Sequence, residues 1–133
     1  MQSTFYAHSR YIERYGLPTT EADWTDHWFV SHADAARTPF FAWLESVVAP
    51  RNIVLRSASQ KVLMESMLAG VGIGFMPVFQ ASELSELHEV IPPRPTWAVP
   101  VWLVTHVDLH RTAKVQAISG VLRDAVAELS LVA

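Results

Sequence analysis

The decapeptide Leu68-Ala69-Gly70-Val71-Gly72-Ile73-Gly74-Phe75-Met76-Pro77 decides how this chain folds, because it contains three of the five glycines in the sequence. Just before and at its start, apolar residues spaced at i, i+1, i+4 and i+5 predict a helix: Leu63, Met64, Met67 and Leu68. Gly70 lies where a helix commonly ends in a left-handed residue. Ile73–Met76, closed by Pro77, has the composition of a short buried strand. The decapeptide therefore predicts a helix, a glycine turn and a strand, in that order.

This order argues against a nucleotide site, although the glycine spacing superficially resembles one. A dinucleotide-binding motif runs from strand to glycines to helix, because the phosphate binds at the amino end of the helix. Here the helix precedes the glycines. We interpret the cluster as a helix stop followed by a tight turn into a strand.

The composition sets the size and class of the protein. The chain has 133 residues, half of them hydrophobic, with five tryptophans and no cysteine, and its mean hydropathy is +0.19. This length suffices for one domain with its own core. The apolar excess has two explanations that the sequence leaves open: a richly packed core, or an apolar surface that meets a partner or a missing part of the same protein.

Several classes of protein are disfavoured by the same data. No apolar run reaches the roughly 18 residues that a membrane-spanning helix needs. The first residues lack the basic and apolar regions of a signal peptide, and the absence of cysteine fits a reducing compartment. We therefore expect a cytoplasmic protein. The net charge of −3, with scattered basic residues, predicts that this chain alone does not bind nucleic acid.

Strand-like and helix-like segments alternate along the chain. The expected strands are Thr4–Ala7, His27–Ser31, Asn52–Arg56, Ile73–Met76, His88–Ile91 and Val99–Thr105. The expected helices are Ser9–Tyr15, the segment from Thr38 to Pro50, the segment from Ser57 to Ala69, Phe79–Leu87 and Thr112–Leu129. Such alternation predicts an α/β fold with a mostly parallel sheet flanked by helices.

Three sequence motifs resemble those of one protein family. Tyr6–Pro18 reads YAHSRYIERYGLP, similar to the family's YASPAYLxxxGxP; Ala69–Pro77 reads AGVGIGFMP, similar to AGxGIxxxP; and Val101–Leu109 reads VWLVTHVDL, similar to LWLVTHPDL. The motifs occur in the family's order and cover nearly the whole chain. The chain thus resembles the effector-binding domain of LysR-type transcriptional regulators.

The resemblance implies a fold, a function and a domain division. The fold would be one lobe of a type II periplasmic-binding-protein-like fold. Residues 1–107 would form the second subdomain, and residues 108–133 a return segment and last helix that pack on a first subdomain absent from this chain. The implied function is to sense a small-molecule effector, with no cofactor. DNA would be bound only through a further domain that this chain also lacks.

Candidate binding residues lie where strands give way to helices. Ser57, Ser59 and Gln60 follow one expected strand, and Ser31 and His32 end or follow another. Serine hydroxyls and amides at a helix amino end suit an anionic effector, and the family's cleft lies at the matching junction. The alternatives remain an ordinary helix cap, with Ser57 and Gln60 in the form of a capping box, and a solvated loop.

Other kinds of chemistry receive less support. His106 and His110 are four residues apart but span an expected strand end and loop, so we expect no metal site. The sequence has no G-x-S-x-G elbow, and an enzyme is the less favoured class. Besides the regulator, we consider a lobe of a transport-type solute-binding protein, which would need an export signal, and a small α/β enzyme.

The last expected helix carries an apolar stripe with two possible partners. It consists of Val115, Ile118, Leu122, Ala125 and Leu129. The stripe could pack on the chain's own sheet or, by resemblance, on the missing first subdomain. In the second case an apolar face would remain in water. We therefore expect self-association.

Overall fold

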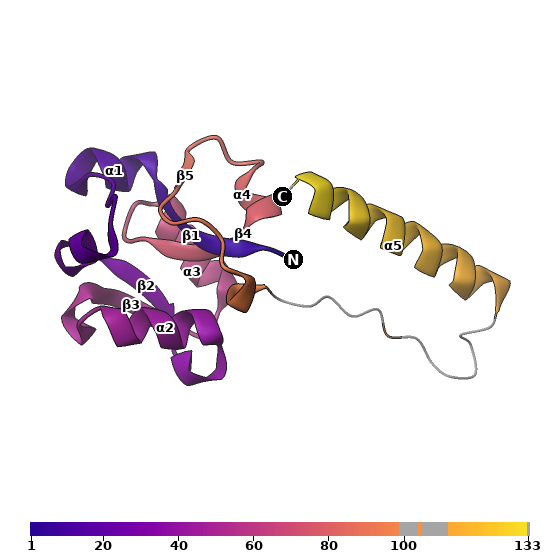
Figure 1. Ribbon diagram of the computed structural model, residues 1–133, viewed down its shortest axis with the longest axis horizontal. Helices are drawn as coiled ribbons and strands as arrows, with labels where there is room; N and C mark the ends of the chain where they lie inside the picture. Colours follow the sequence, from indigo (N-terminus) through magenta and orange to yellow (C-terminus); the bar gives the residue numbers. More distant parts are fainter. Residues whose placement is uncertain (99–103, 105–111, 133) are drawn as a thin grey trace.

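The computed structural model describes residues 1–98, 104 and 112–132, with the side chains of 129–132 excepted (Figure 1). The strands are β1 (Ser3–His8), β2 (Phe29–His32), β3 (Ile53–Ser57), β4 (Gly74–Pro77) and β5 (Leu87–Glu89). The helices are α1 (Ser9–Tyr15), α2 (Pro39–Val47), α3 (Gln60–Leu68), α4 (Val78–Ala81) and α5 (Ala113–Val132). Short 3-10 helices cover Glu21–Asp26, Ala35–Arg37, Pro50–Asn52 and Pro95–Trp97. No described helix is long and apolar enough to span a bilayer.

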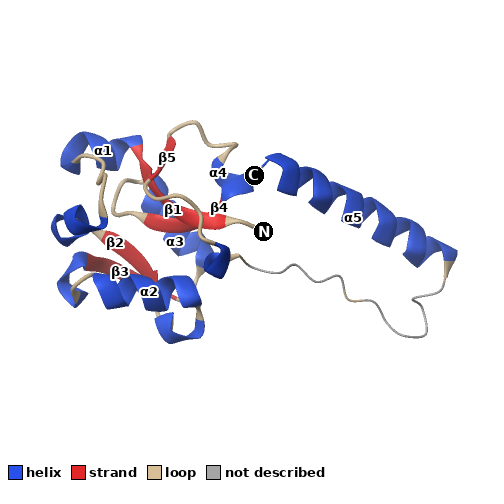
Figure 2. Ribbon diagram, viewed as in Figure 1, coloured by secondary structure: helices blue, strands red, loops and turns tan. Residues whose placement is uncertain are grey.

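The strands form two groups that meet at one residue. β2 pairs in parallel with β3, and β1 pairs antiparallel with both β4 and β5. Ile73 joins the groups: its amide donates to the carbonyl of Trp28, and its carbonyl accepts from the amide of Val30, both at 2.9 Å. The resulting order across the molecule is β3-β2-β4-β1-β5 (Figure 2).

The α/β class is confirmed, and the expectation of a mostly parallel sheet is met only in part. The parallel order holds for β2 with β3 and for the bridge between Phe29 and Ile73. β1 departs from it by running antiparallel to its neighbours. Hydrophobic patterning cannot reveal this, because β1 is buried at every position and would read the same in either direction.

Several element boundaries also differ from the sequence-based expectation, and that of α4 differs most. α4 is a single turn rather than a helix reaching position 87, and β5 is shorter than the expected strand. The strand expected over 99–105 lies outside the described residues, except for exposed Val104. The third family-like motif and both histidines of the H-x3-H pair also lie outside them, save for Val104.

Helices cover both faces of the sheet, as the two apolar clusters show. Phe5 of β1 is fully buried, and its ring lies 5.0–5.9 Å from four aromatic rings. These rings belong to Trp24, Trp43, Phe75 and Trp97. The neighbouring Tyr6 points to the opposite face, since side chains alternate along a strand. There it packs with Met67 of α3 and with Met76, Ala81 and Leu87.

A buried polar network fixes the segment that leads into β2. The hydroxyl of Tyr11 accepts from the amide of Trp28 at 2.9 Å and lies 2.7 Å from Nδ1 of His27. Asn52 Nδ2 donates to the carbonyl of His27 at 2.8 Å. Burial raises the pKa of Tyr11 to about 12. Burial also lowers the pKa of His27, so its neutral ring is favoured, and Nδ1 can accept the tyrosine proton.

The three glycines of the decapeptide lie so close to neighbouring residues that an added Cβ would press on them. Gly70 has a φ of 79°, and a Cβ there would lie 2.9 Å from Cβ of Arg10 on α1. A Cβ on Gly72 would lie 3.1 Å from the carbonyl carbon of Phe29, and one on Gly74 would lie 2.8 Å from Sδ of Met67. The predicted helix, glycine turn and strand are therefore confirmed, and the turn is also a packing surface.

We predict that Gly72→Ala lowers the free energy of unfolding by about 1–3 kcal/mol, as overpacking typically does. Its added methyl would press on backbone atoms of Phe29, which cannot rotate away. Gly120→Ala is the matched control, because no described residue outside its own helix lies within 4 Å of its added Cβ and alanine is the better helix former. Urea denaturation measures both. Equal stability of Gly72→Ala and the native chain would contradict this packing.

Candidate functional site

The candidate residues after β2 and β3 lie at one edge of the sheet. Because the two strands are parallel, their carboxyl ends meet, with His32 opposite Ser57 and Ser31 opposite Arg56. The amide of Ala33 donates to the carbonyl of Ser57 at 3.1 Å and ties the ends together. This edge is where open α/β sheets bind ligands.

The turn from β3 into α3 differs in detail from the predicted capping box. Ser57 is the last residue of β3, and its hydroxyl accepts from the amide of Ser59 at 3.1 Å. That local turn delays the helix, so Ser59 becomes the N-cap and accepts from the amide of Val62 at 3.3 Å. The prediction of a capping box between Ser57 and Gln60 is therefore wrong, because Ser59 and not Ser57 is the N-cap. Ser59 is an ordinary helix cap, as one of the two alternatives proposed.

Two amides at the start of α3 remain open to a ligand. Within the described part of the chain, the backbone N–H groups of Gln60 and Lys61 have no hydrogen-bond acceptor. The first N–H groups of any helix lack partners inside it. The partial positive charge at a helix amino end attracts anions. Lys61 adds a full charge, which its distant partner Glu65, 3.8 Å away and exposed, offsets only weakly.

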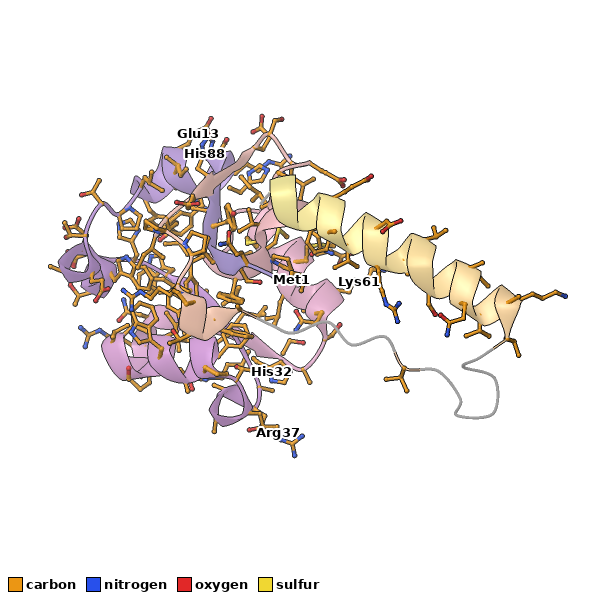
Figure 3. All side chains as sticks on the ribbon, turned by 45° about the vertical axis from the view of Figure 1, so that its right-hand side comes forward. Met1, Glu13, His32, Arg37, Lys61 and His88 are labelled. Atoms are coloured by element: carbon orange, nitrogen blue, oxygen red, sulfur yellow. The ribbon has the colours of Figure 1, made fainter. Side chains whose placement is uncertain are left out.

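A hollow of about 290 Å³ opens beside these amides (Figure 3 labels Lys61 on α3). It lies between the start of α3, the end of β4 and α4. Its lining consists of Gln60, Lys61, Leu63, Met64, Phe75, Met76, Pro77 and Gln80. Two side-chain amides and an ammonium thus surround a mostly apolar floor, which is the usual makeup of a small-molecule site.

The predicted residues are only partly brought together here. Gln60 lines the hollow, whereas Ser31, His32, Ser57 and Ser59 lie beside it at the same edge without lining it. Sequence reasoning missed Lys61, Met64 and Gln80. The same strand-end argument, applied to the strand that closes with Pro77, would have pointed to Gln80.

Ser31 and His32 have different surroundings, and neither lies in the solvated loop considered for them. Ser31 is fully buried within β2, and its hydroxyl has no hydrogen-bond partner among the described residues. His32 is half-buried at the end of β2 (labelled in Figure 3), and its Nδ1 accepts from the amide of Asp34 at 2.9 Å. Its ring lies 6.2 Å from that of Phe41. The nitrogen Nδ1 is thus already engaged by the turn.

No metal centre is evident in the part of the chain that the structure describes. No three histidine, aspartate or glutamate side chains there lie close enough to hold an ion. The arrangement at the sheet edge offers hydrogen-bond donors and one cation. Its chemistry is that of binding an acceptor-rich or negatively charged group.

Comparison with known proteins gives the family. A family model for the LysR substrate binding domain matches residues 2–127. The chain belongs to this family. The resemblance drawn from the sequence motifs is therefore confirmed, and with it the periplasmic-binding-protein-like fold. A search of curated protein sequences found no match.

Two solved structures resemble this LysR-type domain. The full-length Vibrio cholerae virulence activator AphB, described as a member of the LTTR protein family, is 18% identical with a TM-score of 0.51. The match covers 67% of this chain and 32% of that one. The regulatory domain of AphB from Vibrio vulnificus is 15% identical with a TM-score of 0.49, covering 67% and 47%. The domain thus spans about half of that regulatory domain, and similarity at this identity shows the fold alone.

We predict opposite effects for two serine substitutions at the sheet edge. Ser59→Ala removes the helix cap and should lower the free energy of unfolding by about 1 kcal/mol. Ser31→Ala removes a buried hydroxyl that has no hydrogen-bond partner in the described part of the chain, so it should leave stability unchanged or raise it. Chemical denaturation of the two variants side by side tests both. A loss in Ser31→Ala as large as that in Ser59→Ala would show that the Ser31 hydroxyl is hydrogen-bonded.

Proposed function

We propose that this domain senses a small-molecule effector for a LysR-type regulator whose DNA-binding part is not in this sequence. The family match over residues 2–127 carries the proposal. Effector binding would shift the equilibrium between arrangements of the intact regulator and so change how it binds DNA in the cytoplasm. The domain itself is not an enzyme and, with a net charge of −3, does not bind duplex DNA.

The effector we propose is a small anion with an apolar body. Its negative group would accept hydrogen bonds from the free amides of Gln60 and Lys61, with Ser57 and Ser59 at the same turn and Ser31 and His32 on the neighbouring strand. Its body would contact Met64 and the end of β4. A helix amino end contributes about 0.3–1 kcal/mol at an exposed site, so one lobe alone should bind weakly.

A pair of substitutions at one position isolates the amide. Gln60→Pro removes the first free N–H of α3, at a helix position that proline tolerates. The preceding Ser59 already has the extended backbone that proline requires, with φ −90° and ψ 117°. Gln60→Ala removes the side chain and keeps the N–H. The difference in anion affinity between the two variants therefore measures the contribution of the Gln60 backbone N–H.

We predict that acetate and sulfate, titrated against the native chain by NMR, shift the amide signals of Gln60 and Lys61 at millimolar concentration. Gln60→Ala should retain this binding, and Gln60→Pro should weaken it severalfold, because a helix amino end contributes only about 0.3–1 kcal/mol. Equal affinity of the two variants would refute the amide contact. Shifts confined to other regions of the domain would place the anion site elsewhere.

The domain division also remains a proposal. We infer that residues 1–107 form the second subdomain and that residues 108–133 return to a first subdomain, with α5 as the packing element. The carboxyl end of α5 lies beside α4 (Figure 1), and much of the apolar stripe of α5 faces solvent. Ile118 is 60% exposed and Leu122 45% exposed, Ala125 is exposed, and Val115 is half-buried. The side chain of Leu129 lies outside the described residues.

We predict that this chain self-associates through α5, because exposed apolar surface costs about 25 cal/mol for each Å². Sedimentation equilibrium should show a species larger than a monomer. Leu122→Glu, which places a charge on the stripe, should shift the chain toward monomer. Ala127→Glu adds the same charge to another face of α5 and should not. A native chain that stays monomeric at high concentration would contradict the prediction.

A further inference from the structure

A second hollow lies at the opposite end of the strands from the candidate effector site. It has a volume of about 320 Å³ and is lined by Arg14, Tyr15, Trp28, Val54, Gly70 and Val71. We propose that it binds a small aromatic carboxylate. The proposal does not depend on the effector site, because the two hollows share no residue.

The position of this hollow follows from the order of residues in the strands. Trp28 directly precedes β2, and Val54 is the second residue of β3, so both mark the amino ends of these strands. Ser57 is the last residue of β3 and therefore marks the carboxyl end of the strands, where the effector site lies. α3 runs between the two ends, beginning at Gln60 and finishing just before Gly70. A ligand in one hollow cannot contact residues of the other.

The walls of the hollow are apolar side chains that the fold leaves in water. Tyr15, Val54 and Val71 are 43%, 45% and 43% exposed. Val54 is exposed because its neighbours on β3, Ile53 and Leu55, pack on the core and alternation turns it to the other face. Together with the ring of Trp28, these side chains form a surface suited to a flat apolar group, whose burial would stabilise a complex.

The hollow also has a cation, Arg14, on its rim. The guanidinium of Arg14 lies 5.8 Å from the centre of the Tyr15 ring. Arg37, Arg56 and Arg94 each form a salt bridge, and among the described residues Arg14 forms none. A guanidinium presents paired donors that match the two oxygens of a carboxylate. An arginine beside aromatic and aliphatic side chains therefore favours an aromatic acid over a neutral or purely polar ligand.

The backbone at two positions that line the hollow, Trp28 and Gly70, is held by contacts with neighbouring elements. Trp28 donates its amide to Tyr11 and accepts from the amide of Ile73, each at 2.9 Å. Gly70 packs against α1 so closely that a Cβ would lie 2.9 Å from Arg10 Cβ. Pre-ordered walls reduce the entropy lost on binding. The volume lies at the lower end of the about 300–1,000 Å³ typical of ligand pockets, as a single-ring acid requires.

The test is an NMR titration of this chain with benzoate, with benzyl alcohol as the uncharged probe of similar shape. Benzoate should shift the indole N–H of Trp28 and the methyl signals of Val54 and Val71. Arg14→Gln should weaken benzoate binding about fivefold, the upper range for an exposed ion pair, and leave benzyl alcohol binding unchanged. Arg51→Gln removes another exposed arginine and serves as the control.

The outcomes separate this proposal from the effector site. Benzoate shifts at Gln60 and Lys61 alone would overturn the second site and leave the proposed function standing. Equal benzoate affinity in Arg14→Gln and Arg51→Gln would also overturn it, since the carboxylate would then not contact Arg14. Benzoate affinity about fivefold lower in Arg14→Gln than in Arg51→Gln, with unchanged acetate shifts at Gln60, would support it. The exposed position of Arg14 lets the variant fold, which its spectrum verifies directly.

Discussion

Between Gly70 and Gly74 the backbone passes close to α1, β2 and α3, so that a Cβ on any of the three glycines would press on a neighbouring residue, and most of the architecture depends on that approach. Gly70 lets the end of α3 contact α1, and Gly72 brings the turn onto the backbone of Phe29. Ile73, held between them, can then exchange hydrogen bonds with Trp28 and Val30. This single residue connects the parallel pair of strands to the antiparallel ones. A larger residue at Gly72 would push the two groups apart.

The same junction places the candidate site. Because Ile73 joins β2 and β4, the end of β4 lies at the edge where β2 and β3 also end. α3 starts at that edge, and its first two residues, Gln60 and Lys61, line the hollow together with residues of β4. On one face of the sheet, the aromatic side chains around Phe5 pack β1 against α2.

Local chemistry made part of this structure predictable from the sequence. The conformation of the glycine turn depends on a few adjacent residues, so the sequence could predict it. The prediction of this turn is confirmed, as are those of the family and the α/β class. Strand direction depends on partners distant in sequence, which explains why antiparallel β1 was missed. The cap moved from Ser57 to Ser59 because the Ser57 hydroxyl found a nearer amide. Arg14 and Lys61 became candidates only through spatial neighbours that no periodicity reveals, whereas Gln80 follows the end of a strand that the sequence did predict.

Amide hydrogen exchange at the junction tests the account most directly. If the glycine turn unites the sheet, the amides of Val30 and Ile73 should exchange only through global unfolding. Their exchange free energies should then equal the unfolding free energy from denaturation and those of the β1 amides. Exchange of Val30 and Ile73 through a much smaller opening, with β1 still protected, would show two independent groups of strands and contradict the account.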